Sequence, residues 1–138
     1  MPVPRIRHLA IRSRDVERSV RFYRDGLGFK EIGPRGSGVD LSDETLNLTI
    51  LPFVDSPAPA PEEGLEQIHF GIVVADSQGL YRRLSELGVL SVRHDIKARN
   101  EPIAGVVPEG SYKLLDPDGN VIDVTPNRAE WRGVGHLP

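Results

Sequence analysis

The sequence predicts an α+β fold made of two βαβββ modules, and three observations support this prediction. Chemically similar residues recur at a constant interval, since His8 and His69 are 61 residues apart and so are Asp15 and Asp76. Each histidine lies in a strand-like alternating segment, and each aspartate precedes a helix-like apolar repeat. Further short alternating segments follow in both halves, separated by glycine and proline. A repeat of this length indicates a duplicated module.

The boundaries of the modules follow from composition. The segment from Pro57 to Gly64 is rich in proline and contains two glutamates, which is typical of an extended connector. We therefore expect a single domain over residues 1–138, with a first module at about 4–53, a linker at about 54–66, a second module at about 67–126 and a C-terminal tail at 127–138.

The first module is predicted to begin with a strand over residues 5–11. A helix follows from Asp15 as its N-cap, because apolar residues from Val16 to Leu27 recur at helical spacing, and Gly28 ends it. Three more strands are predicted at 29–32, 39–41 and 46–51, with a loop at 33–38.

The second module repeats this order. A predicted strand at 67–74 precedes a helix that begins after Asp76 and ends at Gly88. The final two strands are joined by the run Asp-Pro-Asp-Gly-Asn at 116–120, which is typical of a tight turn because glycine accepts a positive φ. The remaining segments are a strand around 92–96, a long loop at about 98–110, and strands at 112–115 and 121–125.

Side chains alternate between the two faces of a strand, so the residues of each predicted strand can be sorted. One face collects large apolar side chains and is expected to be covered by the helices. Asp123 falls on the other face, in the middle of an apolar strand, where a carboxylate needs an ion-pair partner or a metal. An arginine such as Arg5 or Arg7 is one candidate partner. The polar face collects His8, Ala10, Asn47, Thr49, His69, Gly71, Asp123 and Thr125, and its small residues predict a cavity.

Composition excludes several classes of protein. The chain has no cysteine, which excludes disulfides, thiolate nucleophiles and sulfur-ligated metals. A net charge of −3 without a basic patch argues against nucleic-acid binding. No apolar run approaches the roughly 20 residues that cross a bilayer, and the first residues do not have the pattern of a signal peptide. We therefore expect a cytoplasmic protein without a membrane partner.

These features resemble the vicinal oxygen chelate superfamily, which includes glyoxalase I, extradiol dioxygenases, methylmalonyl-CoA epimerase and bleomycin or fosfomycin resistance proteins. The resemblance covers nearly the whole chain, and it rests on His8, the run from Phe22 to Phe29, His69, and the turn before Asp123. It implies a half-barrel around a cavity, a homodimer, and a divalent metal held by those two histidines and Asp123. It also implies that Asn47 stands at the fourth ligand position.

The chemistry of this set agrees with the implied metal. Two imidazoles and one carboxylate suit Fe, Mn, Ni, Co or Zn, and they leave open positions for two oxygens of a small-molecule substrate. The alternative is that His8 and His69 are hydrogen-bonded histidines of a wet cavity, with Asn47 as a further polar lining residue.

Three functions are compatible with these residues. An oxygen-consuming dioxygenase is favoured, because the two-histidine, one-carboxylate set is typical of it. A glyoxalase I-like lyase or an epimerase is the second, although Asn47 stands where such relatives have a glutamate or glutamine, and an amide cannot act as a base. The sequence departs from the family in two more places. Asp123 stands in place of the more usual glutamate, and Lys113 stands at the position of an extradiol tyrosine, which counts against classical catechol cleavage.

The third candidate is a metal-free protein that binds a drug of the bleomycin type. Such a protein needs aromatic walls, and the chain has only four Phe, three Tyr and one Trp. Two of these aromatic residues each have more than one predicted role. Tyr112 is either a general acid or a packing residue, and Trp131 in the tail covers the sheet edge, the cavity or a dimer contact.

Overall fold

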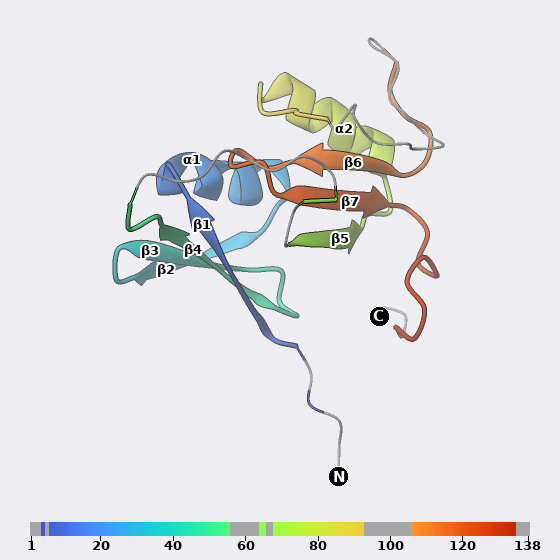
Figure 1. The fold of residues 1–138 in the computed structure, drawn as a ribbon. Coiled ribbons are helices and arrows are strands. Elements are labelled where there is room, and N and C mark those ends of the chain that lie inside the picture. The colour runs from blue at the N-terminus through green and yellow to red at the C-terminus, as the bar shows by residue number, and fades with distance from the viewer. Residues whose placement is uncertain (1–3, 5, 56–63, 66–67, 93–105, 135–138) are drawn as a thin grey trace. The chain divides into compact units, whose positions relative to one another are not determined.

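The computed structural model describes residues 4, 6–55, 64–65, 68–92 and 106–134. The chain divides into two compact units, Met1–Pro59 and Ala60–Pro138, and each is described by itself. Each unit contains one small mixed sheet with helical segments, as expected for the predicted α+β fold (Figure 1). No helix among the described residues is long and apolar enough to cross a membrane.

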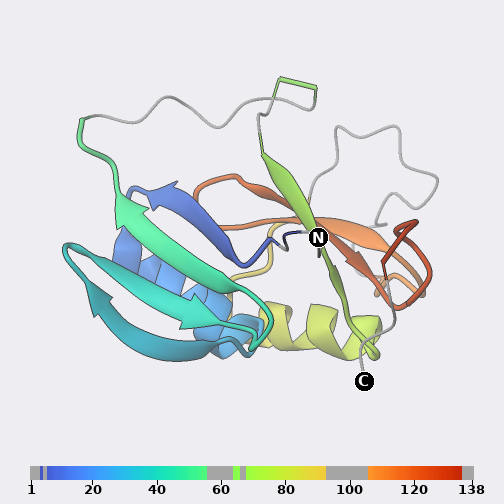
Figure 2. The same cartoon turned by 90° about the horizontal axis from the view of Figure 1, so that it is seen from below.

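The first unit contains a four-stranded sheet in the order β1-β4-β3-β2. The pair β1 and β4 is parallel, while β4 and β3, and β3 and β2, are antiparallel. The helical segment between β1 and β2 lies along one face of this sheet (Figure 2). The elements are β1 (His8–Ser13), α1 (Val16–Arg21), the π-helical segment η1 (Phe22–Gly26), β2 (Lys30–Arg35), β3 (Gly38–Ser42) and β4 (Asn47–Pro52).

Local sequence explains where this helical segment begins and ends. Asp15 is the N-cap, as predicted, and its carboxylate accepts a hydrogen bond from the backbone N–H of Arg18. After η1 the chain turns through Gly28, whose φ of +85° is readily adopted only by glycine. The buried side chains of Val20, Phe22 and Tyr23 fix this segment on the apolar face of the sheet.

The predicted loop at 33–38 is wrong in part. Strand β2 continues through Gly33 and Pro34 to Arg35, so the turn is confined to residues 36–37. Proline is tolerated there because β2 is an edge strand, where a missing N–H costs no inner-sheet hydrogen bond. The register between β2 and β3 shifts between Glu31 and Gly33, which is the irregularity that glycine often marks.

The second unit contains a three-stranded sheet in the order β5-β7-β6, with β5 parallel and β6 antiparallel to the central strand β7. Helix α2 lies along one face of it in both views (Figures 1 and 2). Asp76 is the N-cap of α2 and accepts from the N–H of Gly79. The elements are β5 (His69–Val73), α2 (Ser77–Glu86), β6 (Tyr112–Leu115) and β7 (Val121–Thr125).

The turn between β6 and β7 is built by its first aspartate. Asp116 Oδ1 accepts hydrogen bonds from the backbone N–H groups of Asp118 and Asn120 at 2.9 and 2.8 Å. Its Oδ2 accepts from the amide of Asn120, and Gly119 adopts a φ of +84°. The run read from the sequence as a turn therefore sets the register in which β7 returns along β6.

Most of the predicted strand at 92–96 and of the long loop at 98–110 lies outside the described residues. Val92 forms an isolated antiparallel bridge with Leu114 on β6, which is where a further strand of this sheet would lie.

The sorting of strand faces is confirmed within each unit. Large side chains on the helix-covered faces are buried, among them Ile11, Leu48, Ile50, Ile122 and Val124. The faces opposite carry the polar residues that form the candidate site.

Candidate functional site

Two predicted site residues lie side by side on the polar face of the first sheet. His8 on β1 and Asn47 on β4 are paired across the parallel strands. Their side chains are in contact, with His8 Nδ1 2.5 Å from Asn47 Oδ1. His8 is exposed and Asn47 is half-buried, so the pair lies where a ligand can reach it.

A buried carboxylate that the sequence interpretation missed lies next to this pair. Asp40 on β3 is paired with Thr49 on β4, whose hydroxyl donates to Asp40 Oδ1 at 2.6 Å. Arg35 Nε donates to both carboxylate oxygens, at 2.9 and 2.8 Å. The signal was available in the sequence, because Asp40 is a carboxylate in the middle of an apolar strand, as Asp123 is.

These contacts keep Asp40 ionised. The hydrogen bond from Thr49 is the largest influence, and it lowers the pKa of Asp40 below the value of 3.8 usual for aspartate. Hydrogen bonds from Arg35 and Asn47 lower the pKa further, while burial opposes them by desolvating the carboxylate. At neutral pH Asp40 therefore accepts hydrogen bonds and cannot donate them.

This network orients the amide of Asn47 and, through it, the ring of His8. Since Asp40 only accepts, the nitrogen of the Asn47 amide faces Asp40 and its oxygen faces His8. An amide oxygen also only accepts, so the hydrogen in that contact is on Nδ1 of His8. In neutral His8 the lone pair is then on Nε2, which is the nitrogen available to a ligand.

The polar face of the second sheet holds the other two predicted ligands. His69 Nε2 lies 3.5 Å from Asp123 Oδ2, and their side chains are 47% and 24% exposed. Lys113 on β6 is paired with Asp123 in the register, and its Nζ lies 3.6 Å from Asp123 Oδ1. Asp123 thus has a cation from its own module beside it.

The two modules place the polar residues of their last strands at different positions relative to the first strand. In the first module, His8 pairs with Asn47 and Ala10 pairs with Thr49. In the second, His69 pairs with Val121 and Gly71 pairs with Asp123. By position in the sheet, Asp123 therefore corresponds to Thr49 rather than to Asn47, a two-residue difference that spacing along the chain does not reveal.

The comparisons with known proteins agree with this architecture. A sequence model of the Glyoxalase/Bleomycin resistance protein/Dioxygenase superfamily matches residues 5–124. The chain belongs to this superfamily. The predicted resemblance is thereby confirmed, whereas no curated protein matches the chain.

Solved structures of the superfamily show the same fold. A glyoxalase/bleomycin resistance protein/dioxygenase from Alicyclobacillus acidocaldarius is 25% identical, with a TM-score of 0.58 over 87% of this chain and 89% of that one. The oxidase ChaP-H2 is 18% identical, with a TM-score of 0.64 over 91% and 95% of the two chains. The fosfomycin resistance protein FosX from Mesorhizobium loti is 16% identical, with a TM-score of 0.63 over 91% and 94%.

The donor atoms of the second module fit part of a metal site. Two donors bound to one zinc ion at about 2.1 Å and at the tetrahedral angle lie about 3.4 Å apart. The separation of 3.5 Å between His69 Nε2 and Asp123 Oδ2 is close to that value. Within the described part of either unit, no three His, Asp or Glu side chains are grouped as a metal site. Neither module alone supplies a complete ligand set among its described residues.

Tyr112 lies on the face of the second sheet that α2 covers. It pairs with Val124, one residue along β7 from Asp123 and therefore on the other face of the sheet. Its buried hydroxyl donates to the backbone oxygen of Ser77 at 2.6 Å. Burial raises the pKa of Tyr112, with the nearby Tyr81 and Asp76 adding to the rise, so the hydroxyl stays protonated.

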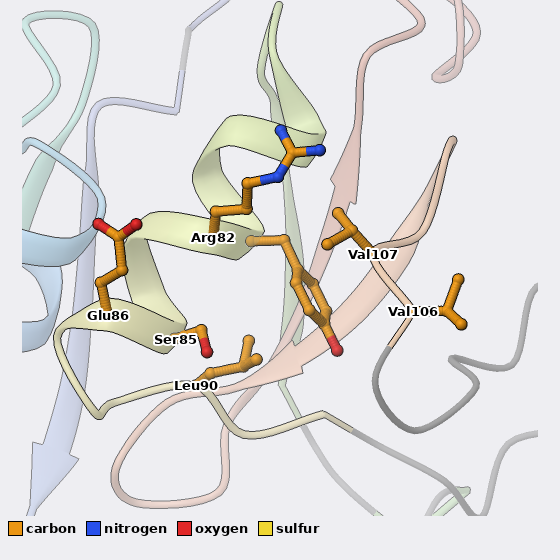
Figure 3. Close-up of a pocket in the computed structure, with 7 residues that line it drawn as sticks. Arg82, Ser85, Glu86, Leu90, Val106 and Val107 are labelled. Carbon is orange, nitrogen blue, oxygen red and sulfur yellow. The ribbon is translucent and has the colours of Figure 1, made fainter.

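A pocket of about 360 Å³ lies beside α2, and Tyr81, whose ring contacts Tyr112, is one of the residues that line it. Figure 3 shows Arg82, Ser85 and Glu86 of α2 around it, together with Val106 and Val107 from the segment before β6. It contains none of the predicted ligands. The candidate site is therefore defined by the polar sheet faces and not by this pocket.

Proposed function

We propose that the chain is a divalent-metal-dependent enzyme of its superfamily that binds vicinal oxygens of a small organic substrate. His8, His69 and Asp123 are the proposed ligands for Fe, Mn, Ni, Co or Zn. The observation that carries the proposal is that both modules present a histidine with a polar partner on the polar sheet face, His8 with Asn47 and His69 with Asp123. A complete set requires ligands from both modules, of one chain or of two.

The first module prepares its histidine for this role. The contact with Asn47 leaves Nε2 of His8 as the lone-pair nitrogen, which is how metal-binding histidines are commonly oriented by a neighbouring acceptor. We therefore assign Asn47 the role of a positioning residue, in preference to the fourth ligand position. When bound, the ion would polarise the two substrate oxygens and stabilise negative charge that develops on them.

Dioxygenase-type chemistry is favoured over isomerisation because, among its described residues and apart from the proposed ligand His8, the polar face of the first sheet offers no suitable base. Asn47 is an amide and Thr49 a hydroxyl, and neither takes up a proton near neutral pH. Asp40 is a carboxylate, but its lowered pKa and its hydrogen bonds with Thr49 and Arg35 make it a weak base. A lyase or isomerase would need a base from elsewhere in the chain.

Metal analysis tests the proposal directly. The protein purified without added metal is analysed for bound ions, and Ni²⁺ or Fe²⁺ is titrated by calorimetry under anaerobic conditions. We expect one ion per chain and loss of binding in His8→Ala, His69→Ala and Asp123→Asn. The exposed Glu86→Gln on α2 is the matched control and should bind as wild type does. Absence of any stoichiometric ion in the wild type would refute metal dependence.

Oxygen consumption separates the proposed reaction from isomerisation. The iron-loaded protein is given catechols and related diols in an oxygen electrode, and methylglyoxal with glutathione in a parallel assay. Uptake of oxygen with a diol supports the dioxygenase. Turnover of the second mixture without oxygen uptake supports the glyoxalase-like alternative.

One observation favours the alternative of a metal-free binding protein. Lys113 provides Asp123 with a positive neighbour at 3.6 Å, so the carboxylate has a charge partner without any metal. A sequestering protein of this kind would be stabilised by a bleomycin-type ligand in thermal unfolding and would show no turnover. Two of the similar solved structures are named as an oxidase and a fosfomycin resistance protein. Both are under 25% identical to this chain, so they support the fold and do not discriminate between these functions.

Two further predictions belong to this proposal. Homodimerisation is expected from the superfamily resemblance and is checked by sedimentation. A cytoplasmic location is expected from the composition and is checked by fractionation of the cells that make the protein.

A further inference from the structure

The C-terminal tail brings the single tryptophan of the chain onto the polar face of the second sheet. Gly71 lies in the middle of β5, and a Cβ built on it would overlap atoms Cζ2 and Cη2 of Trp131. The indole therefore occupies the space that any larger residue would fill at this position. The contact is with the face of an edge strand and not with its open edge.

The tail reaches this position through an ordered turn that follows β7 directly. Asn127 donates its N–H to Thr125 Oγ1 at 3.1 Å, and its side-chain oxygen accepts from the N–H of Ala129 at 2.9 Å. The N–H of Glu130 donates to the backbone oxygen of Asn127 at 3.2 Å. In Figure 1 the tail leaves the end of β7 and runs to the β5 side of the sheet. Trp131 is thus held one residue beyond a hydrogen-bonded turn.

Trp131 lies next to the proposed metal ligands of its module. Gly71 pairs with Asp123 across β5 and β7, and His69 is two residues before Gly71 on the same face. The ring atoms nearest to Gly71 are Cζ2, Cη2 and Cε2, so the six-membered ring of the indole packs against the strand at this residue. Trp131 is only half-buried, so part of the indole surface is left for stacking.

We propose that Trp131 is a specificity-determining residue, which forms an aromatic wall beside Asp123 and selects substrates with a flat, conjugated ring next to their vicinal oxygens. This inference rests on the proposed function for the position of those oxygens. Gly71 is required for this arrangement, because its lack of a side chain leaves the space in which the indole packs against the strand. A saturated diol offers two vicinal oxygens without a ring face, so it gains nothing from the wall. Its hydroxyls are also less acidic than those of catechol and bind a metal ion more weakly, so only the part of the preference that depends on Trp131 reports the wall.

The test compares a flat diol with a saturated one. Catechol and trans-cyclohexane-1,2-diol are titrated by calorimetry into the Ni²⁺-loaded protein, and the emission of Trp131, the only tryptophan, is followed in parallel. We expect catechol to bind more tightly than the saturated diol and to change the emission. About five- to tenfold of this preference should depend on the ring of Trp131, the factor expected for one aromatic stacking contact.

Two variants should remove this preference by different routes. Trp131→Leu removes the aromatic ring. Gly71→Ala keeps Trp131 in the chain but fills the space on the strand in which its indole packs. Trp131→Phe keeps a ring and should retain part of the preference, which separates loss of stacking from loss of folding. Gly110→Ala is the control for the glycine substitution, because a Cβ there meets nothing within 4 Å. Circular dichroism checks that each variant is folded.

The outcomes distinguish this inference from the proposed function. Equal affinity for the two diols, no affinity for either, or an unchanged preference in Trp131→Leu and Gly71→Ala would each overturn the role of Trp131. Calorimetry with Ni²⁺ alone is the separate readout for the metal. A wild-type protein that binds no Ni²⁺ but keeps a Trp131-dependent preference for catechol would refute metal dependence and leave the aromatic wall standing.

Discussion

Replacing Asp40 by asparagine should destabilise the first unit, and the size of the effect follows from the contacts of the carboxylate. Asp40 accepts from Thr49 at 2.6 Å and from Arg35 at 2.8 and 2.9 Å, and its side chain is 12% exposed. A hydrogen bond to a charged group contributes about 1.5–3 kcal/mol, and one to a neutral group about 0.5–1.5. When the acceptor changes from a carboxylate to an amide, the contribution of the buried hydrogen bond from Thr49 to stability should therefore fall by about 1–1.5 kcal/mol.

Arg35 adds little to this loss. Its side chain is 63% exposed, and an ion pair of that kind contributes about 0–1 kcal/mol. The NH₂ group of the asparagine would face Arg35 or Thr49, both of which donate to Asp40 in the wild type, and this repulsion adds to the loss of stability. We expect Asp40→Asn to lower the free energy of unfolding by about 1.5–3 kcal/mol in total, a shift of about 1 M in the urea midpoint for a slope near 2 kcal/mol per M.

The dependence on pH gives the sharper test. The pKa of Asp40 is lower in the folded protein than the usual 3.8, so its contribution is fully present above that value and is lost as the pH falls through the folded pKa. Urea unfolding of wild type and Asp40→Asn, followed by circular dichroism, should show the full difference at pH 7 and a shrinking one below pH 3.8. Asp55→Asn, an exposed carboxylate of the same unit, is the control and should show no such loss. A difference that stays constant with pH would refute the assignment of Asp40 as the ionised acceptor.

Three further predictions concern the site and its surroundings. Asn47→Leu should weaken Ni²⁺ binding about 10- to 100-fold, as loss of an orienting partner does. In ¹⁵N spectra of the metal-free variant, His8 should no longer be held in its Nδ1–H tautomer. An unchanged tautomer would contradict the positioning role of Asn47. Lys113→Met should tighten Ni²⁺ binding up to about fivefold by removing a positive charge 3.6 Å from Asp123, and equal affinities would show that the lysine does not compete. Tyr112→Phe should cost about 1–2 kcal/mol in thermal unfolding, because the backbone oxygen of Ser77 loses its partner, and it should leave turnover unchanged; loss of turnover with normal stability would return the tyrosine to the chemistry.

Much of the fold could be predicted from local signals. The repeat interval gave the two modules, and Asp15 and Asp76 cap their helices as expected. The alternation of apolar residues placed His8 and Asp123 on the polar faces, because a period of two assigns each side chain to a face wherever the strand begins. Strand ends were less accurate, as β2 shows, since an edge position tolerates a proline that would otherwise end a strand.

The candidate site could be predicted only in part. Residue types on one face suggested metal ligands, yet Asp40 was overlooked although the reasoning applied to Asp123 applies to it equally. The lysine beside Asp123 and the indole over Gly71 were also not foreseen as contacts. The contact of the lysine depends on which residues lie opposite one another on neighbouring strands, and the contact of the indole depends on the path of the tail. Chain spacing reports neither.

The sequence by itself determined the duplicated α+β modules, the superfamily, and the face of each sheet on which the chemistry lies, because apolar periodicity, caps and turns are local properties. Only the tertiary structure decided that Asn47 orients His8, that Asp123 has Lys113 beside it, and that Trp131 rests on Gly71. These contacts join residues far apart in the chain, and they are set by strand register and by the path of the tail. A shift of two residues keeps every side chain on its face but changes every partner.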